Sequence, residues 1–176
     1  MEIDFRLETL TEGLDSLGLN ISVKQQKQFQ TYHESLIRWN RHINLTSPRA
    51  LRDIEHVHFW DSLSLVPLLV PELAARPKLI DIGSGAGFPG IPIKLLLPDI
   101  RLTLVEATNK KADFLKWLIP LLGLVNVEVI AARAENLAHM DQYRESFDVA
   151  TARALGRIGT VLELTLPFCS IGGIVA

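Results

Sequence analysis

Four glycines within eight residues, at positions 83, 85, 87 and 90, form the segment of the chain with the clearest chemical content. An apolar, β-branched run ends at Asp81-Ile82, immediately before them. Glycine tolerates positive φ and has no side chain, so such a turn lets a ligand approach the backbone closely. Glu106 lies 19 residues beyond Gly87, where its carboxylate can accept hydrogen bonds from a ribose diol. The spacing therefore predicts a site for a nucleoside-containing cofactor.

Two cofactors fit this layout. Residues 85–90 match the pattern G-x-G-x-x-G, which would make the protein a nucleotide-dependent oxidoreductase. In that pattern the strand runs straight into the first glycine, and the helix N-terminus faces a pyrophosphate. Here the strand ends earlier, and Asp81 places a carboxylate at the mouth of the turn. Because an anion there repels a pyrophosphate but suits the ammonium group of S-adenosylmethionine, we favour the methyl donor and keep the dinucleotide as an alternative.

Short β-branched runs alternate with amphipathic segments from residue 78 onward. The predicted strands span 78–82, 101–105, 127–131, 147–150 and 172–176, and the predicted helices span 88–97, 109–122 and 158–168. Strands that alternate with helices form a parallel sheet through crossover connections. The predicted fold class is therefore α/β, with a Rossmann-like sheet over residues 76–176. Its last strand would leave an open apolar edge, so we expect this sheet to be incomplete, without C-terminal strands.

Residues 1–75 are predicted to form an N-terminal helical extension. Apolar residues recur at steps of four and three at Ile3, Leu7, Leu10, Leu14 and Leu17. Ser22 and Gln25 have the spacing of a capping box, which starts a second helix. A further helical stretch is predicted around Leu51 to Val70, where Pro71 ends it. We expect the extension and the sheet to form one folded unit.

Composition narrows the class of protein. With 176 residues, of which 48% are hydrophobic, the chain supports one domain with a sizeable core. The single Cys169 excludes an internal disulfide, and no Cys/His spacing suits a metal, so no metal is expected. The N-terminus has no basic segment followed by an apolar run, and no stretch approaches 18 apolar residues. We therefore expect a cytoplasmic protein without a membrane span.

The net charge of −2 hides a gradient along the chain. Residues 24–60 carry six Lys or Arg against three acidic residues, together with four of the five histidines. A basic patch of this kind suits nucleic-acid phosphates, and its candidate contacts are Arg38, Arg41 and Arg49. The alternative is a solvated helix face.

The segment LIDIGSGAGFPGIP at residues 79–92 closely resembles the cofactor turn of the glucose-inhibited division protein B family. These proteins are the bacterial small-subunit ribosomal RNA guanine-N7 methyltransferases. Residues 39–46 are similar to the family's W-N-x-x-x-N-L-T stretch, and residues 58–62 to its H-x-x-D-S segment. Further blocks at 110–115, 133–135 and 147–154 follow in the family's order, so the resemblance covers roughly residues 30–176. It implies an enzyme that transfers a methyl group from S-adenosylmethionine to N7 of a guanine in 16S ribosomal RNA.

The resemblance also implies roles for particular residues. The cofactor-binding set is Asp81, Gly83, Gly85, Gly87, Phe88, Glu106, Ala134 and Glu135. In this set the glycine backbone approaches the amino acid part, Asp81 orders the turn or a water, and the backbone at 134–135 meets the adenine ring. The alternative for Glu135 is a carboxylate that stabilises a helix N-terminus. The implied partner is 16S ribosomal RNA or the small ribosomal subunit, bound by a monomer.

Guanine N7 has an available lone pair at neutral pH, so no catalytic base is expected, and positioning can supply ~7 to 11 kcal/mol. Arg153, directly after the fourth strand, is the candidate catalytic and RNA-contacting residue. We predict that it grips phosphate or the cofactor carboxylate, because a bond to N7 itself would block methylation. An ion pair with Glu145 or Asp148 is the alternative. Lys110 is a further candidate for RNA, or one residue of a solvated helix face.

His58 and Asp61 lie three residues apart on a predicted helix, where they would face the cleft or make capping and core hydrogen bonds. The family's chains continue beyond the strand at 172–176 with a lysine and a further strand pair, whereas this sequence stops first. A truncated module that binds cofactor or RNA without turnover is therefore the second alternative.

Overall fold

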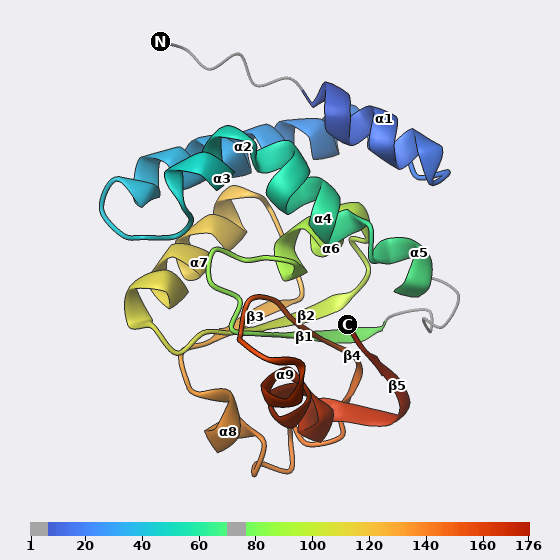
Figure 1. The fold of residues 1–176 in the computed structure, drawn as a ribbon, viewed down its shortest axis with the longest axis vertical. Coiled ribbons are helices and arrows are strands. Elements are labelled where there is room, and N and C mark those ends of the chain that lie inside the picture. Colours follow the sequence, from blue (N-terminus) through green and yellow to red (C-terminus); the bar gives the residue numbers. More distant parts are fainter. Residues whose placement is uncertain (1–6, 70–76) are drawn as a thin grey trace.

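A sheet of five parallel strands forms the centre of the computed structural model, which describes residues 7–69 and 77–176 (Figure 1). The strands lie in the order β3-β2-β1-β4-β5. Their bounds are Lys78–Ile82 for β1, Arg101–Val105 for β2, Val127–Ile130 for β3, Phe147–Ala152 for β4 and Cys169–Val175 for β5. All four pairings are parallel, so every connection crosses over and the carboxyl ends of the strands meet at one edge. The predicted α/β class is confirmed.

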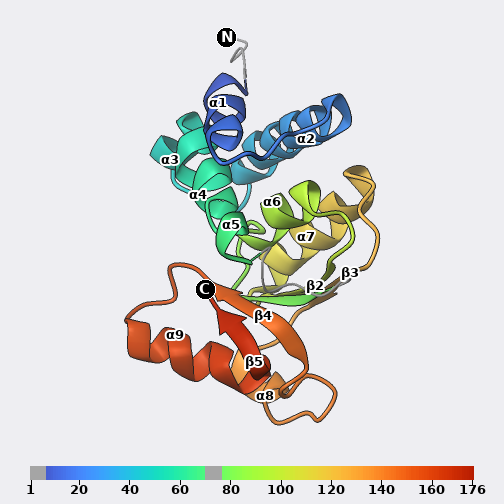
Figure 2. The ribbon, with the colours of Figure 1, turned by 90° about the vertical axis from the view of Figure 1, so that its right-hand side faces the viewer.

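The helices that connect the strands lie on both faces of the sheet (Figure 2). They are α6 (Gly90–Leu96), α7 (Asn109–Leu121), α8 (Ala134–Leu137) and α9 (Ile158–Thr165). The prediction merged α9 with the short 3-10 segment Leu166–Phe168 and started the last strand at 172. Pro167 explains the difference, because proline has no backbone N–H with which to continue an α-helix.

The N-terminal helices form a further layer that covers α6 and α7 (Figure 2). This helical layer contains α1 (Glu8–Ser16), α2 (Val23–Asn40), α3 (Pro48–Arg52), a π-helical segment (Glu55–Trp60), α4 (Asp61–Leu63) and α5 (Val66–Leu69). The predicted capping box is present: the Ser22 side chain accepts from the Gln25 N–H, and Gln25 Oε1 accepts from the Ser22 N–H at 2.7 Å. Residues 3–6 of the predicted first stripe lie outside the described residues.

The stretch predicted to be helical around residues 51–70 is largely helical over its described residues 51–69, but it is not one continuous α-helix. The structure divides this stretch into α3, the π-helical segment, α4 and α5. Pro67 in the first turn of α5 favours a new helix start, since its missing N–H lies where a helix needs none. The π-helical segment also rotates the side chains that follow it relative to a regular helix. The predicted boundary near residue 75 falls in a stretch outside the described residues and stays a prediction.

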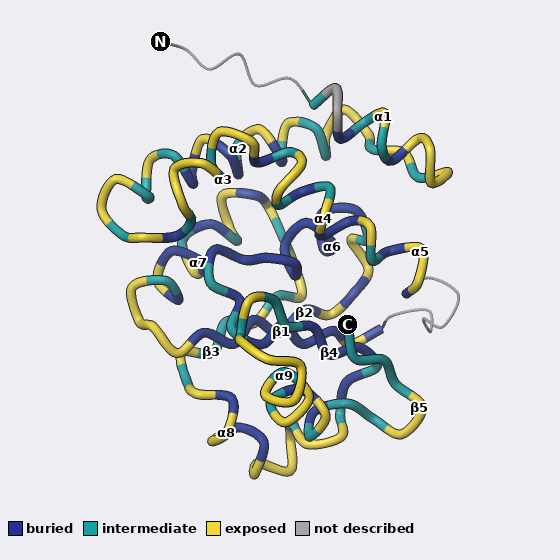
Figure 3. The backbone as a smooth tube through the Cα atoms, in the orientation of Figure 1, coloured by how far each residue is buried: buried dark blue, intermediate teal, exposed yellow. Residues whose placement is uncertain are grey.

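One apolar cluster joins the helical layer to the sheet. It runs from Leu10 and Leu14 through Phe29 and Tyr32 to Phe114, all fully buried. Figure 3 shows this burial concentrated in the sheet and in α6 beneath the helical layer. The Tyr32 hydroxyl donates to the Ala86 carbonyl at 2.6 Å. The helical layer therefore holds the glycine turn directly.

Gly87 marks the closest approach of these two parts. Its φ is +101°, and a Cβ there would lie 2.5 Å from Ile91 Cδ1 and 2.8 Å from the Tyr32 hydroxyl. We expect Gly87→Ala to lower the free energy of unfolding by roughly 2 to 5 kcal/mol, because both the backbone and the packing oppose it.

Urea denaturation measures this effect, with Gly123→Ala as the matched control. Gly123 also has positive φ, but a Cβ there meets nothing within 4 Å, so only about 1 to 2 kcal/mol should be lost. If both variants lose the same free energy of unfolding, the contacts of the new Cβ at Gly87 do not destabilise the protein.

Candidate active site

Two adjoining cavities lie at the carboxyl ends of the strands, on either side of the glycine turn. Their volumes are about 440 and 140 Å³. Gly83, Ala107 and Leu155 line both, so the two cavities adjoin and form one cleft. The larger part is lined from the helical layer by Leu45, Thr46 and His58, and from the sheet side by Glu106, Lys111 and Arg153. We call this whole space the cleft.

The glycine turn is pinned to the end of β2. The Gly83 and Ser84 N–H groups both donate to the Val105 carbonyl, at 2.8 and 3.0 Å. Gly83 and Gly85 have φ of +69° and +57°, and both line the cleft. Gly87 does not line it, because it faces Ile91 and Tyr32. The prediction that a ligand approaches all three glycines therefore needs correction: Gly87 is required for packing.

Glu106 lies against the same turn with both carboxylate oxygens engaged. Oε2 accepts from the Gly85 N–H at 2.8 Å, and Oε1 accepts from the Thr108 N–H at 2.7 Å. A carboxylate oxygen has about two lone-pair sites, so each oxygen retains one for a further donor. The side chain is only 6% exposed and lines the cleft. It is therefore a fixed double acceptor of the kind that two neighbouring hydroxyls can satisfy.

Asp81 is fully buried beneath the turn and does not reach its mouth. Its Oδ2 accepts from the Gly90 N–H at 3.3 Å, and its Oδ1 accepts from the Thr151 hydroxyl at 3.0 Å. The predicted contact of this carboxylate with a ligand ammonium is therefore wrong, whereas its predicted role in ordering the turn fits. Gly90 is the first residue of α6, so the helix N–H that a dinucleotide pyrophosphate would use already has an internal acceptor.

Burial raises the pKa of Asp81 from 3.8 to about 7, although hydrogen bonds from Thr151 and Gly90 oppose the shift. The folded protein then holds more protons than the unfolded chain between about pH 4 and 7, so this group's contribution to stability is lost as pH rises through that window. His58 acts in the opposite direction, because burial and the charge of Arg153 lower its pKa to about 4.

The substitution Asp81→Asn separates the pH dependence of stability that Asp81 causes from the one that His58 causes. The free energy of unfolding of the variant relative to the wild type should rise by about 2 to 3 kcal/mol between pH 5 and 8. Urea denaturation of both proteins across this range measures it. A difference that stays constant with pH would show that Asp81 does not titrate in the folded protein.

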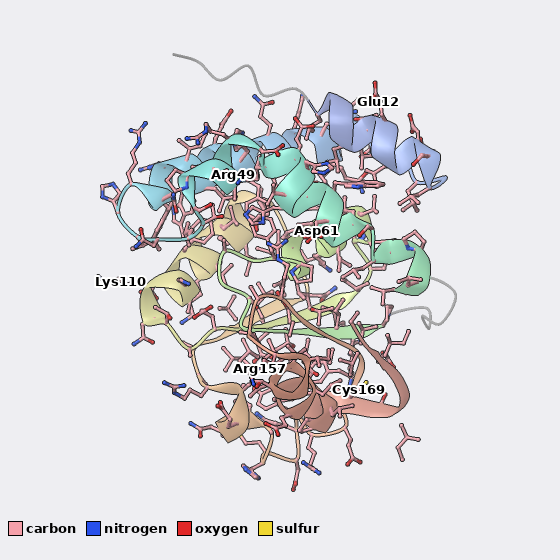
Figure 4. The ribbon with its side chains drawn as sticks, viewed as in Figure 1. Glu12, Arg49, Asp61, Lys110, Arg157 and Cys169 are labelled. Atoms are coloured by element: carbon pink, nitrogen blue, oxygen red, sulfur yellow. The ribbon has the colours of Figure 1, made fainter. Side chains whose placement is uncertain are left out.

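Arg153 lies at the other side of the cleft in a network with the helical layer. Its Nη1 donates to Asp61 Oδ2 at 2.8 Å and to the Val57 carbonyl at 3.4 Å. Its Nη2 lies 2.6 Å from His58 Nδ1, and the guanidinium is centred 5.1 Å from the Phe88 ring. His58 stacks on Phe88 with ring centroids 4.4 Å apart. Figure 4 shows Asp61 on the side of the helical layer that faces the sheet.

The predicted alternative of an ion pair with Glu145 or Asp148 is wrong. Glu145 lies 3.8 Å from Arg144, and Asp148 accepts from the Lys78 N–H. Arg153 instead pairs with Asp61, and its side chain remains 26% exposed. Of its five N–H donors, the Nε–H and one Nη2–H have no partner among the residues that the structure describes. These two unpartnered donors belong to a side chain that lines the cleft.

The remaining predicted cofactor residues are divided between the two cavities. Ala134 and Glu135 both line the smaller cavity, Ala134 buried and Glu135 exposed at the start of α8. Phe88 lines the larger cavity and is 5% exposed. Glu135 lies in the first turn of the four-residue α8, which agrees with the alternative of a carboxylate at a helix N-terminus.

The predicted RNA-contacting residues do not all lie together. Arg38, Arg41 and Arg49 are exposed on the helical layer, with the Arg38 guanidinium 5.9 Å from the Trp117 ring centre. Lys110 is exposed in the first turn of α7 and does not line the cleft (Figure 4). Its neighbour Lys111 lines the cleft instead. The helical phase, which changes by about 100° per residue, could have indicated this choice.

Sequence reasoning missed the cleft-lining Leu45, Thr46, Ala107 and Leu155 as site residues. The W-N-x-x-x-N-L-T stretch was the available signal for the first two. Over residues 7–69 and 77–176, no helix has the length and apolar content to cross a bilayer. Over the same ranges, no three His, Cys, Asp or Glu side chains are close enough to hold a metal ion.

The sequence is similar to a known protein family and to individual proteins that bear its name. The family model described as rRNA small subunit methyltransferase G matches residues 25–176. Ribosomal RNA small subunit methyltransferase G of Dehalococcoides mccartyi is 46% identical over 167 residues, which cover 95% of this chain and 70% of that protein. The protein of the same name from Leuconostoc mesenteroides is 41% identical over 166 residues, covering 94% and 70%.

Among solved structures, the fold is similar to an S-adenosylmethionine-dependent methyltransferase from Thiobacillus denitrificans in complex with S-adenosyl-L-homocysteine. The TM-score is 0.50 at 20% identity, covering 80% of this chain and 52% of that one. A precorrin-6y C5,15-methyltransferase from Geobacter metallireducens has a TM-score of 0.53 at 18% identity, covering 69% and 60%. At these identities the likeness confirms the Rossmann-like fold.

Proposed function

The chain belongs to the rRNA small subunit methyltransferase G family, and from this premise we propose that it methylates N7 of a guanine in 16S ribosomal RNA, using S-adenosylmethionine. The single observation that carries the proposal is the cleft itself. It places the fixed double acceptor Glu106 and the glycine turn beside a half-buried arginine with two free donors, among the described residues.

The chain's own groups suit the two halves of such a reaction. We propose that the free lone pairs of Glu106 accept the two ribose hydroxyls of the cofactor, while Gly83 and Gly85 adjoin its amino acid part. The smaller cavity, beside Ala134 and Glu135, is the place proposed for the adenine ring. The bound cofactor would supply a methyl group activated by its sulfonium.

The acceptor half requires positioning more than acid-base chemistry. Guanine N7 attacks through its own lone pair, so the residues must align it with the methyl carbon and exclude other orientations. We propose that Arg153 directs its two free donors to an RNA phosphate or to the cofactor carboxylate. Its contacts with Asp61 and His58 fix the guanidinium beforehand, so less conformational entropy is lost when the substrates bind.

The exposed basic residues of the helical layer are proposed as the RNA-contacting surface. Arg38, Arg41 and Arg49 come from a region that is basic in a chain of net charge −2. Phosphate contacts of this kind release counterions, so binding should weaken as salt increases. Their reversal to glutamate should reduce RNA affinity and flatten its salt dependence. We further propose that the protein acts as a monomer in the cytoplasm, where ribosomal RNA is modified.

The proposal is tested with small ribosomal subunits and free 16S ribosomal RNA that lack N7-methylguanosine. The purified chain and S-adenosylmethionine should produce this nucleoside, detected by nuclease digestion and mass spectrometry, at one position. Calorimetry should show binding of S-adenosylmethionine and none of NAD. Selective binding of NAD would overturn the proposal in favour of an oxidoreductase, and cofactor binding without any methylated RNA would favour a binding module.

A further inference from the structure

A hydrogen-bonded chain leads from Arg153 through His58 to Thr46. Arg153 Nη2 lies 2.6 Å from His58 Nδ1, and His58 Nε2 lies 2.7 Å from the Thr46 hydroxyl oxygen. All three side chains line the larger part of the cleft. The Thr46 backbone is fixed as well, because its N–H donates to Asn40 Oδ1 at 3.0 Å. This series of hydrogen bonds thus ends at the Thr46 hydroxyl, which is held in one place beside the cleft.

The direction of this chain follows from the chemistry of its first member. A guanidinium nitrogen can only donate, so His58 Nδ1 must be the acceptor and carries no proton. A neutral imidazole then bears its proton on Nε2, which donates to the Thr46 oxygen. The lowered pKa of His58, at about 4, agrees with a neutral ring at physiological pH.

The orientation of the Thr46 hydroxyl is the consequence. Because its oxygen accepts from His58, its own proton must point elsewhere. No second partner of this hydroxyl is present among the residues that the structure describes. The oxygen keeps a second lone pair, but the proton of the hydroxyl has no partner among these residues, so Thr46 can donate one hydrogen bond into the cleft, in an arrangement that Arg153 fixes through His58.

We propose that Thr46 donates this hydrogen bond to O6 of the target guanine and so selects guanine at the reacting position. This inference rests on the proposed function. The guanine edge that carries N7 also carries O6, both acceptors, and N7 must stay free to receive the methyl group. Adenine has an amino group where guanine has O6, so it offers no acceptor for the Thr46 proton. Thr46 is then a specificity-determining residue.

The test compares two bases at the nucleotide that the wild-type enzyme methylates. Ribosomal RNA is assembled with either guanine or 2-aminopurine at that position; 2-aminopurine keeps N7 and replaces O6 by hydrogen. The wild type should prefer guanine, and Thr46→Val should reduce this preference by about 5- to 100-fold, since the variant loses the hydrogen bond that only guanine can accept. Because the bases are compared within each enzyme, their intrinsic difference in N7 reactivity cancels between enzymes.

Three controls make the result specific. Thr46→Ser keeps the hydroxyl and should keep the preference. Thr31→Val removes a threonine hydroxyl on α2 that bonds the Lys27 carbonyl outside the cleft, and should also keep it. Calorimetry with S-adenosylmethionine should give equal affinities for the wild type and for Thr46→Val.

The possible outcomes are distinguishable. If Thr46→Val methylates guanine but retains the wild-type preference over 2-aminopurine, Thr46 does not bind O6, and the inference is overturned while the proposed function stands. If the wild type methylates no guanine in ribosomal RNA, the proposed function fails and the inference fails with it.

Discussion

Glu106→Ala is expected to weaken the binding of S-adenosylmethionine by on the order of 100-fold or more. Hydrogen bonds to a charged group contribute about 1.5 to 3 kcal/mol each, and two ribose hydroxyls would lose their acceptor. The same substitution releases the N–H groups of Gly85 and Thr108, which lie 2.8 and 2.7 Å from the carboxylate oxygens. The turn then has to reorder when the cofactor binds, which lowers the affinity further. Titration calorimetry measures the dissociation constant directly.

Glu106→Gln sharpens this expectation. An amide retains one acceptor oxygen but turns its NH₂ group toward a backbone N–H, so the variant should resemble Glu106→Ala. Glu128→Ala is the matched control, because Glu128 is exposed on β3 and lines a different cavity. Its affinity should stay within twofold of the wild type. An unchanged affinity in Glu106→Ala would falsify the placement of the ribose at this carboxylate.

The parts of the fold that were predictable are those in which local pattern and tertiary position agree. β1 and β2 have the predicted bounds. Each is a short run with apolar and β-branched residues, and four of its five residues are buried in the parallel sheet. The capping box of α2 was likewise visible in four consecutive residues. The stretch 51–70 was not predictable in detail, since an apolar period continues across it although the backbone changes from α to π geometry.

In the candidate site, residue types were easier to predict than their orientation. Asp81 and Glu106 both follow from the spacing around the glycine turn, yet one is fully buried and the other lines the cleft. Side chains alternate between the faces of a strand, so a carboxylate within β1 and one just after β2 need not face the same space. The pairing of Arg153 with His58 joins residues 95 positions apart, and no local pattern encodes such a contact.

The helical layer is part of the site rather than a cover over it. Thr46 and His58 come from this layer, whereas Glu106 and Arg153 follow strands of the sheet. Tyr32 of α2 donates to the glycine turn itself, so the position of the layer and the shape of the turn depend on each other. A change in the packing of α2 should therefore alter cofactor binding as well as stability.

Arg153→Ala is expected to reduce the rate of methylation by roughly 100-fold or more, with a smaller effect on cofactor affinity. Arg153 lines the cleft, and two of its N–H donors have no partner among the described residues. Its other donors hold Asp61 and His58 in place. A displacement of about 1 Å at a reacting centre is enough for a rate loss of this size. Single-turnover methylation of small ribosomal subunits at saturating cofactor measures the rate without contributions from product release.

Arg153→Lys tests whether geometry or charge is responsible. A lysine ammonium can pair with Asp61. It lacks the planar guanidinium, which lies near the Phe88 ring and donates to Asp61 and to His58 Nδ1 at the same time. The lysine variant should therefore stay closer to the alanine variant than to the wild type. Arg157→Ala removes an exposed arginine of the same loop and should leave the rate unchanged, provided that its thermal unfolding matches the wild type. Full activity of Arg153→Lys would mean that a positive charge near Asp61 suffices, and that the fixed orientation of the guanidinium contributes nothing to the reaction.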